Sequence, residues 1–438
     1  MKKNAKTPKT AAVATLGCKV NQYESASFQS GLEEQGFTVR PFAKSADIYI
    51  INTCAVTAKA AAQSRQLIRR AHRTNPGAEV VVTGCYAQID PEKIREIATG
   101  PVSIVGNANK HQLLNLVIPD TDAGKYFSDI KLSTKISLLP VKRFPGRTRA
   151  FLKVQDGCNN FCSYCIVPHA RGRSRSLALN NVLEQAGKYA EEGHREIVVT
   201  GIHVGHYGMD LTPPVSLLVM LQKLCGRTPE IRFRLSSLEP TEISNDILEL
   251  MATTDNFMPH LHIPLQSGSN KVLKKMNRRY TREQFAEIVN HCRELLPTAA
   301  IGADVLVGFP GEQEEDFSET YELLAGLPVT YLHVFPYSQR PGTPAAKMKN
   351  QVPAKIKEER VAVLRKLDHK KKVAFYGSRL GMVHQVLVES EKSAAGLFKG
   401  FTDNYIPVHF QAKQEHVNRI VPVKLEKLQD RFVIGKLI

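Results

Sequence analysis

Short apolar runs that alternate with longer, helix-prone stretches are the feature that most limits what this chain can fold into. Within the first 120 residues the apolar runs are AAVATL, DIYIIN, AEVVVT and VSIVG, and each precedes a polar or helix-like stretch. The stretch over residues 57–73 is rich in alanine, the residue with the highest helix propensity. Strand–helix alternation predicts a parallel sheet, so we expect an open parallel-sheet α/β domain over residues 9–120.

A second α/β region follows residues 121–145, which are polar at first and are expected to be a linker. Over residues 146–375 six apolar runs recur between helix-like stretches: AFLKV, REIVVTG, IRFRLSS, HLHIPLQ, AIGADVLVGFPG and TYLHVFPYS. Six strand–helix units predict a partial (β/α)6 barrel, which stays open because a closed barrel of this kind has eight strands. In such barrels the chemistry collects at the C-terminal ends of the strands.

The last part of the chain, residues 376–438, changes to short apolar runs separated by turns. This pattern predicts a small β-barrel of a size that suits nucleic-acid binding. The preceding residues 341–380 hold 11 lysines and arginines against 3 acidic residues, and the whole chain has a formal net charge of +17. Such a balance favours a polyanionic partner, most simply nucleic acid, with Lys370, Lys371 and Lys372 as expected phosphate contacts.

The sequence contains no apolar run near the roughly 18 residues of a membrane-spanning helix, so we expect a cytoplasmic protein with no membrane partner. A reducing cytosol does not support a disulfide framework for its eight cysteines, so metal binding or catalysis is the better interpretation. Cys225 and Cys292 lie in helix-like stretches and are expected to be core residues.

Three of the cysteines occupy the same position relative to the predicted strands of the first domain. Cys18, Cys54 and Cys85 each come just after a strand. The C-terminal ends of parallel strands share one edge of a sheet, where ligands bind. One such cysteine would be read as a small buried hydrophobic residue, whereas three predict a common site.

Three further cysteines, Cys158, Cys162 and Cys165, form the run C-x3-C-x2-C directly after the first strand of the predicted barrel. Zinc and iron clusters both accept thiolates and both want four ligands. A zinc ion could take the three cysteines and His169. An iron–sulfur cube could take the three thiolates and leave one iron for an external ligand.

Motifs spread along nearly the whole chain are similar to those of the bacterial methylthiotransferases of the radical S-adenosylmethionine (SAM) superfamily. The motifs are TLGCKVNQYES, INTCAVTAKA, VTGCYAQ, QDGCNNFCSYCIVPHARGRSRS, HIPLQSGS, GADVLVGFPGE and HVFPYSQRPGTPAA. The resemblance implies three parts: an N-terminal three-cysteine domain, a radical SAM domain and a C-terminal TRAM domain.

The segments GCKVNQ, GCYAQ and NRRY most resemble one branch of that family. Its members convert N6-threonylcarbamoyladenosine, next to the anticodon in the tRNA anticodon loop, to the 2-methylthio derivative. Other branches act on isopentenyladenosine in tRNA or on an aspartate of a ribosomal protein. A non-catalytic, zinc-stabilised RNA-binding protein is the alternative from a different class.

The resemblance also implies cofactors and roles for the six cysteines. Cys158, Cys162 and Cys165 would be catalytic, holding a 4Fe–4S cluster that cleaves SAM to a radical. Cys18, Cys54 and Cys85 would hold a second 4Fe–4S cluster from which sulfur is delivered. Two SAM molecules would be used per turnover, and a donor such as flavodoxin or ferredoxin would supply electrons.

Other candidate site residues lie at the ends of the barrel strands and beyond the cysteine loop. A SAM pocket is expected from Gly201, Ser236, Gln266 and Gly308. The run PHARGRSR places Arg171, Arg173 and Arg175 two residues apart, which would put them on one side of an extended segment. We expect Arg171 to serve SAM or the substrate, and Arg173 to bind the carboxylate of the threonylcarbamoyl group, because a guanidinium matches a carboxylate bidentately. The alternative is that these arginines bind tRNA phosphates or the carboxylate of SAM.

Overall fold

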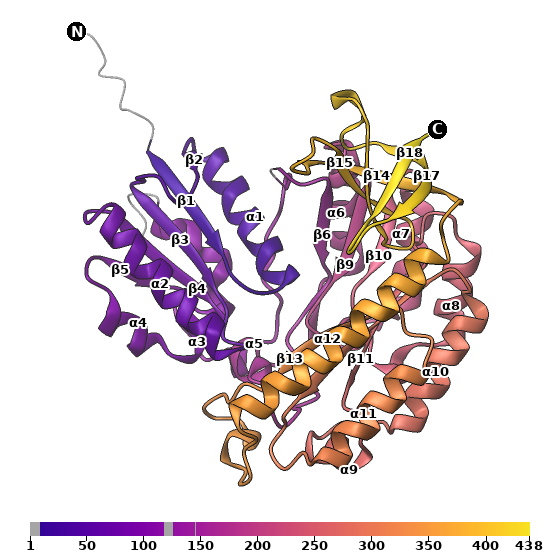
Figure 1. Cartoon of the computed structure of the whole chain (residues 1–438). Helices are drawn as coiled ribbons and strands as arrows, with labels where there is room; N and C mark the ends of the chain where they lie inside the picture. Colours follow the sequence, from indigo (N-terminus) through magenta and orange to yellow (C-terminus); the bar gives the residue numbers. More distant parts are fainter. Residues whose placement is uncertain (1–8, 118–125, 145) are drawn as a thin grey trace.

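A computed structural model describes residues 9–117, 126–144 and 146–438, and Figure 1 shows their arrangement. The first domain is a five-stranded parallel sheet in the order β2-β1-β3-β4-β5. Its strands are β1 (Thr10–Thr15), β2 (Thr38–Arg40), β3 (Ile48–Thr53), β4 (Glu79–Gly84) and β5 (Val102–Ile104). Every residue of the central strand β3 is buried, as its near-continuous apolar sequence IYIINT requires of a strand covered on both faces.

Helices cover this sheet, and a packed segment connects it to the next domain. The helices are α1 (Lys19–Glu34), α2 (Ala58–Thr74), α3 (Cys85–Ile89), α4 (Pro91–Ile97) and the 3₁₀ helices η1 (Asn107–Leu116) and η2 (Ile130–Leu132). The expected linker, residues 121–145, lies partly outside the described residues. Its described part is not a free tether, because Leu139, Val141 and Phe144 are buried.

The second domain is a partial barrel of two three-stranded parallel sheets, ordered β6-β9-β10 and β11-β12-β13. A parallel bridge between Phe233 and Phe257 lies where the two sheets meet. The strands are β6 (Arg149–Lys153), β9 (Glu196–Thr200), β10 (Arg232–Leu235), β11 (His260–Gln266), β12 (Ala300–Val307) and β13 (Tyr331–Pro336). A short antiparallel pair, β7 (Gln155–Asp156) and β8 (Arg175–Ser176), brackets the cysteine loop.

The barrel helices follow their strands, and a long helix closes the domain. They are α5 (Val167–Arg171), α6 (Leu179–Glu191), α7 (Leu217–Arg227), α8 (Asn245–Thr253), α9 (Asn270–Lys275), α10 (Arg282–Leu295), α11 (Glu314–Gly326) and α12 (Ala354–Gly377), with 3₁₀ helices η3 (Val204–His206), η4 (Pro240–Glu242) and η5 (Pro344–Lys347). Cys225 in α7 and Cys292 in α10 are buried in the core, as expected. None of the described helices has the length and apolar character that a membrane-spanning helix needs.

The third domain is a closed five-stranded barrel in the order β14-β15-β16-β18-β17, which confirms the fold class expected from the sequence. Its elements are β14 (Val383–Lys392), β15 (Phe398–Thr402), β16 (Pro407–Phe410), η6 (Gln414–His416), β17 (Ile420–Leu428) and β18 (Val433–Leu437). It docks at the N-terminal ends of the larger barrel's strands. There Arg232 donates to the Gln385 carbonyl at 3.1 Å, and Asn404 donates to the Thr298 carbonyl at 3.0 Å.

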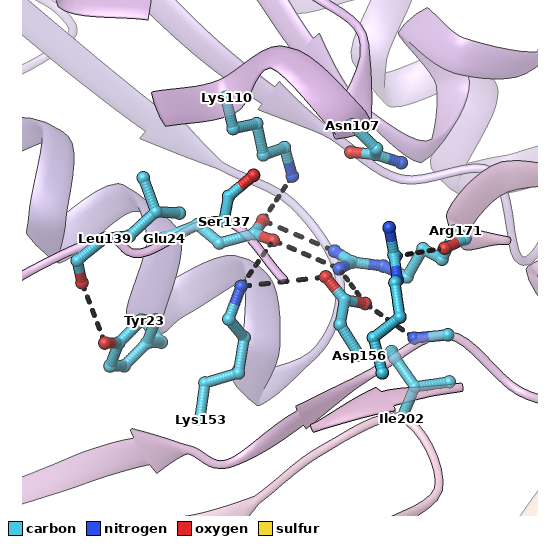
Figure 2. Close-up of polar contacts among 12 residues, drawn as sticks. Tyr23, Glu24, Asn107, Lys110, Ser137, Leu139, Lys153, Asp156, Arg171 and Ile202 are labelled. Atoms are coloured by element: carbon cyan, nitrogen blue, oxygen red, sulfur yellow. Dashed lines mark hydrogen bonds and ion pairs between the residues drawn. The ribbon is translucent and has the colours of Figure 1, made fainter. Parts of the chain in front are cut away.

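A buried ion network joins the first domain to the second (Figure 2). Glu24 of α1 accepts from Arg171 at 3.1 Å, forms a short contact with Lys110 and lies 3.8 Å from Lys153. Asp156 of β7 also pairs with Arg171, at 2.8 Å, and with Lys153, at 3.6 Å. The Glu24, Lys110, Lys153 and Arg171 side chains are at most 3% exposed.

The charge of Glu24 depends on these partners. Burial alone would raise the pKa of its carboxyl, but Arg171, Lys110 and Lys153 outweigh that effect and lower the pKa to about 2. A carboxyl in an unfolded chain titrates near 4.3. The stabilising contribution of Glu24 is therefore present above about pH 4.3 and is lost as the pH falls toward 2.

We predict that Glu24→Gln lowers the free energy of unfolding by about 3–5 kcal/mol at pH 7, because it leaves buried cations without their carboxylate. Urea denaturation measures the change. Glu34→Gln, at an exposed position at the end of the same helix, is the matched control and should stay within about 0.5 kcal/mol of wild type. An equal, small effect of both substitutions would show that the network does not hold the domains together.

Candidate active site

The three N-terminal cysteines meet at the C-terminal edge of the first sheet. Cys18 precedes α1, Cys54 directly follows β3, and Cys85 begins α3 after β4. The residue before Cys85 is Gly84, whose φ of +95° and close approach to the Thr53 carbonyl exclude a side chain. A Cβ on Gly17, the residue before Cys18, would lie 2.9 Å from the Cys54 sulfur. The backbone itself therefore brings the first two cysteines together.

The N-terminal triplet needs nearby positive charge to keep its buried sulfurs as thiolates. Burial raises the pKa of the Cys18 thiol, and burial with the neighbouring Cys85 raises the pKa of Cys54 to about 12. The guanidinium of Arg171 acts in the opposite direction on both. Its buried Nε has no hydrogen-bond partner among the described residues and remains available to an acceptor on a bound group.

The second triplet lies in the loop between β7 and α5. Its residues are half-buried, and the Cys165 amide donates to the Cys162 carbonyl at 3.0 Å. Burial raises the pKa of Cys162 and raises that of Cys165 to about 12. Gly157 begins the loop with φ +76°, and a Cβ there would lie 2.0 Å from the Arg173 carbonyl oxygen. Only glycine fits where the loop passes so close to the returning chain.

Two side chains from elsewhere in the barrel contact these sulfurs, one from the turn between α9 and α10 and one from the turn after β9. Arg278 donates to the Cys162 sulfur at 3.3 Å and also pairs with Glu239. His203 Nδ1 lies 3.6 Å from the Cys158 sulfur, and its Nε2 lies 2.5 Å from Glu242. Burial favours a neutral imidazole at His203, but the bonds to Cys158 and Glu242 prevail and raise its pKa to about 10.

Both triplets fit a cluster better than a single zinc ion. A tetrahedral ion with Zn–S bonds of about 2.3 Å would hold its sulfurs about 4 Å apart. Among the described residues, the groups whose ligand atoms all lie within 4.8 Å of one another contain histidine and carboxylate but no cysteine. His169, the candidate fourth zinc ligand, is exposed on α5. Three thiolates spread further apart match the corners of an iron–sulfur cube.

A cavity of about 950 Å³ lies between the three domains and reaches the N-terminal triplet at Cys18. The larger barrel contributes Gly201 and Ser236, which were expected at a SAM pocket, and the C-terminal barrel contributes Tyr405. Other residues that line it include Lys19, Arg147, Arg149, Phe151, Ile202, Arg234, His260, His262, Asp304, Tyr331, His333 and Glu389.

The turn after β9 connects this cavity to the second triplet. Gly201 and Ile202 line the cavity, while the next residue, His203, contacts Cys158. Gln155, fully buried, fixes the turn by accepting from the Ile202 and His203 amides at 3.0 and 2.8 Å. Its amide nitrogen donates to the Gly157 carbonyl at 2.7 Å, so one side chain holds both the cysteine loop and the cavity wall.

Two of the residues expected at the SAM pocket are not among those lining this cavity. Gly308 follows β12, but α12 covers it, and a Cβ there would lie 2.1 Å from Cγ of Lys357. Gln266 sits at a register shift at the end of β11 with φ +65°. The strand ends do converge, as expected, but packing of the helices decides which of them face the open space.

The three arginines beyond the loop do not share one face, so that expectation is wrong. Arg171 ends helix α5, and Gly172, with φ +73°, turns the chain before Arg173. Arg171 is buried in the ion network and Arg175 donates to the Arg171 carbonyl at 2.5 Å, while Arg173 is exposed. The placement of Arg171 is accounted for without a contact to SAM or substrate.

The three lysines near the end of α12 differ in the same way. Lys371 donates to the Leu327 carbonyl at 2.8 Å, and burial lowers its pKa to about 8. Lys372 pairs with Asp368 at 2.8 Å. Lys370 is exposed, so it is the lysine of this group whose charge is most accessible to RNA.

Sequence reasoning missed Gln155, Glu24 and the function of Arg278. Arg278 lies in the segment NRRY, which indicates a family branch but does not reveal a contact with a cysteine sulfur. Gln155 could have been found, because a polar residue in a predicted buried strand next to a cysteine loop needs hydrogen-bond partners for its amide. Nothing local distinguishes Glu24 from the other acidic residues of α1.

Comparison with known proteins matches both cysteine-bearing domains and the full length. Residues 152–324 match the model of the radical SAM superfamily, and residues 10–106 match that of an uncharacterized protein family, UPF0004. Among solved structures, the radical SAM methyltransferase TsrM of Kitasatospora setae has a TM-score of 0.55 at 17% identity, covering 78% of this chain and 77% of that one. OxsB, a cobalamin-dependent radical SAM enzyme, has a TM-score of 0.51 at 14% identity, covering 82% and 55%. These likenesses concern the fold alone.

Curated relatives extend the match to nearly the whole chain. A threonylcarbamoyladenosine tRNA methylthiotransferase (MtaB) of Bacillus subtilis is 41% identical over 98% of this chain and 96% of its own length. Its counterpart in Aquifex aeolicus is 39% identical over 94% and 99%. A tRNA-2-methylthio-N(6)-dimethylallyladenosine synthase of Pelotomaculum thermopropionicum is 35% identical over 94% of each chain. With two cysteine triplets at strand ends, one of them reaching the cavity at Cys18, and this similarity over its full length, the chain belongs to the radical SAM methylthiotransferase family.

Proposed function

We propose that this chain converts N6-threonylcarbamoyladenosine, next to the anticodon of tRNA, to its 2-methylthio derivative. The observation that carries the proposal is the similarity to five relatives named for this activity, at 33–41% identity over 94–98% of this chain. A methylthiotransferase must bring a hydrogen-abstracting site and a sulfur-donating site to the same carbon. The cavity supports this, because Cys18 lines it directly and the turn that carries Gly201 and Ile202 leads from its wall to His203, which contacts Cys158.

We infer two 4Fe–4S clusters, one on Cys158, Cys162 and Cys165 and the other on Cys18, Cys54 and Cys85, with two SAM molecules used per turnover. When bound, the clusters and SAM supply a radical for the non-acidic C2–H and a source of sulfur. The chain's own residues orient these groups. Gln155 holds the cysteine loop against the Gly201–His203 turn.

The protein residues also control charge and water at the site. Arg278 places a positive charge beside the Cys162 sulfur. The cavity is walled by all three domains, which limits the access of bulk water to a reactive substrate carbon. Gly201, two residues before His203, and Ser236 line the cavity and are the residues we assign to SAM.

The proposed partner is the anticodon loop, whose unpaired bases can be extruded at low cost. The C-terminal barrel lies at the rim of the cavity through Tyr405 and Glu389 and supports a role in holding the RNA. Lys370 is the proposed phosphate contact on α12. Flavodoxin or ferredoxin is the proposed electron donor, and the proposed location is the cytoplasm.

Nucleoside mass spectrometry of tRNA from a deletion strain tests the substrate. We expect loss of 2-methylthio-N6-threonylcarbamoyladenosine and accumulation of N6-threonylcarbamoyladenosine, with restoration by the wild-type gene. Loss of the methylthiolated isopentenyl nucleoside instead, with the threonylcarbamoyl derivative unchanged, would contradict the proposal. The Cys158→Ala gene serves as the matched control, since it should not complement.

Iron analysis tests the number of clusters. Anaerobically reconstituted wild-type protein should contain about eight irons per chain, the content of two cubes. Replacing Cys158, Cys162 and Cys165 together with alanine should leave about half, because the N-terminal triplet lies on a different domain. Loss of all iron from this variant would show that the N-terminal cysteines do not form an independent site.

A second triple variant separates the two chemical steps. With Cys18, Cys54 and Cys85 replaced by alanine, the protein should still cleave SAM reductively to 5′-deoxyadenosine but should insert no sulfur. Chromatography of the SAM products and mass spectrometry of the RNA measure both outcomes. Normal methylthiolated nucleoside from this variant would exclude sulfur delivery by the N-terminal site.

A further inference from the structure

One ammonium group on the cavity wall has no partner: that of Lys19. Lys19 directly follows Cys18 and is the first residue of α1, whose start faces the barrel in Figure 1. The residue is exposed, and the space it borders is the large cavity between the domains. Within the described ranges, no hydrogen bond or ion pair involves its side chain. An anion entering the cavity would therefore find a cation free to bind it.

Of the other cations that line this cavity, Arg147 lies over the Phe151 ring, 5.8 Å from its centroid, and two arginines are paired. Arg149 donates to the Tyr405 hydroxyl at 2.9 Å and to Glu389 at 2.8 Å. Arg234 pairs with the buried Glu196 at 3.2 Å and donates to the Asp403 carbonyl at 3.0 Å. Their guanidinium groups serve the attachment of the C-terminal barrel and of β9, so their capacity for a new anion is reduced.

The substrate has one anion close to its reacting carbon. In N6-threonylcarbamoyladenosine the side group is attached at C6, and a single ring nitrogen separates C6 from C2, the carbon that receives sulfur. A side group that folds over this nitrogen carries its carboxylate toward the edge of the base that meets the sulfur donor. A cation beside the sulfur-donating site can then reach the carboxylate, and Lys19 is the sequence neighbour of Cys18.

We propose that Lys19 binds the carboxylate of the threonylcarbamoyl group and is a specificity-determining residue of this enzyme; the inference rests on the function proposed above. An isopentenyl group has no charge and would leave the ammonium unpaired in a partly desolvated cavity. The same residue therefore favours the charged nucleoside and disfavours the apolar one.

Lys19 replaces Arg173 in this role. The sequence pattern favours Arg173, but that residue is not among those lining the cavity, whereas Lys19 is. Its main chain packs behind the cysteine loop, where its carbonyl oxygen approaches Gly157. Arg173 is consequently a matched control: a cation near the same loop that should not read the side group.

The test measures binding of anticodon stem-loops to the reconstituted holoprotein by fluorescence anisotropy. One stem-loop carries N6-threonylcarbamoyladenosine and the other carries its neutral amide analogue. Wild type should prefer the acid by about 10- to 100-fold, the range for a charge-assisted bond. Lys19→Met should bind both alike, Lys19→Arg should keep most of the preference, and Arg173→Met should match wild type. Iron content of each variant checks that the Cys18 site is intact.

Several results would overturn the inference, and they are distinct from failure of the proposed function. Equal affinity of wild type for acid and amide would overturn it without any variant, even if the acid is methylthiolated. Equal weakening of both stem-loops by Lys19→Met would mean that Lys19 holds an RNA phosphate. Loss of the preference in Arg173→Met but not in Lys19→Met would return the role to Arg173. Methylthiolation of isopentenyladenosine alone by wild type would reject the function and the inference together.

Discussion

The buried carboxylate of Glu24 is the point on which the relation between the two cysteine sites depends. Glu24 lies on α1, the helix that begins directly after Cys18, and its partner Arg171 ends α5, the helix that follows Cys165. The network contains three cations and two carboxylates, Glu24 and Asp156, and so keeps one positive charge in excess beside the N-terminal thiols. A bound cluster with three thiolate ligands would benefit from that charge. Removing one member would leave buried charges unpaired, which is why such a network resists sliding of one domain on the other.

The fixed placement of the domains explains how one chain supports two separate chemical steps. The hydrophobic core runs without interruption from Phe28 and Ile50 in the first domain to Leu152 and Val199 in the barrel. The cavity follows from this packing, because α1 packs against β6 and the third domain docks at the N-terminal ends of the barrel strands. In the proposed function, a substrate base in this cavity would meet the sulfur site at Cys18 and the turn that carries Gly201. Specificity for the side group then falls to the residues beside Cys18.

The features that the sequence predicted are those encoded by local pattern. Alternating apolar runs predicted the parallel sheets of the first two domains. The position of Cys18, Cys54 and Cys85 after strands predicted that they meet, because strand direction alone brings those ends together. Pairings between distant residues carry no such pattern. Glu24 and Arg171 are 147 residues apart, and nothing near either one marks it as the partner of the other. Helix packing is equally hidden from local sequence. Gly308 lies at a strand end, where a ligand contact was expected, but the side chain of Lys357 packs against it.

The distance between the two reduced clusters, measured by pulsed electron paramagnetic resonance on reconstituted protein, tests the central claim most directly. If the network around Glu24 sets the geometry in which both triplets serve one cavity, wild type should give a single narrow distance distribution. Arg171→Met should broaden it, while each cluster keeps its own spectrum. A broad distribution in wild type, or an equally narrow one in Arg171→Met, would contradict this account of how the two sites are held together.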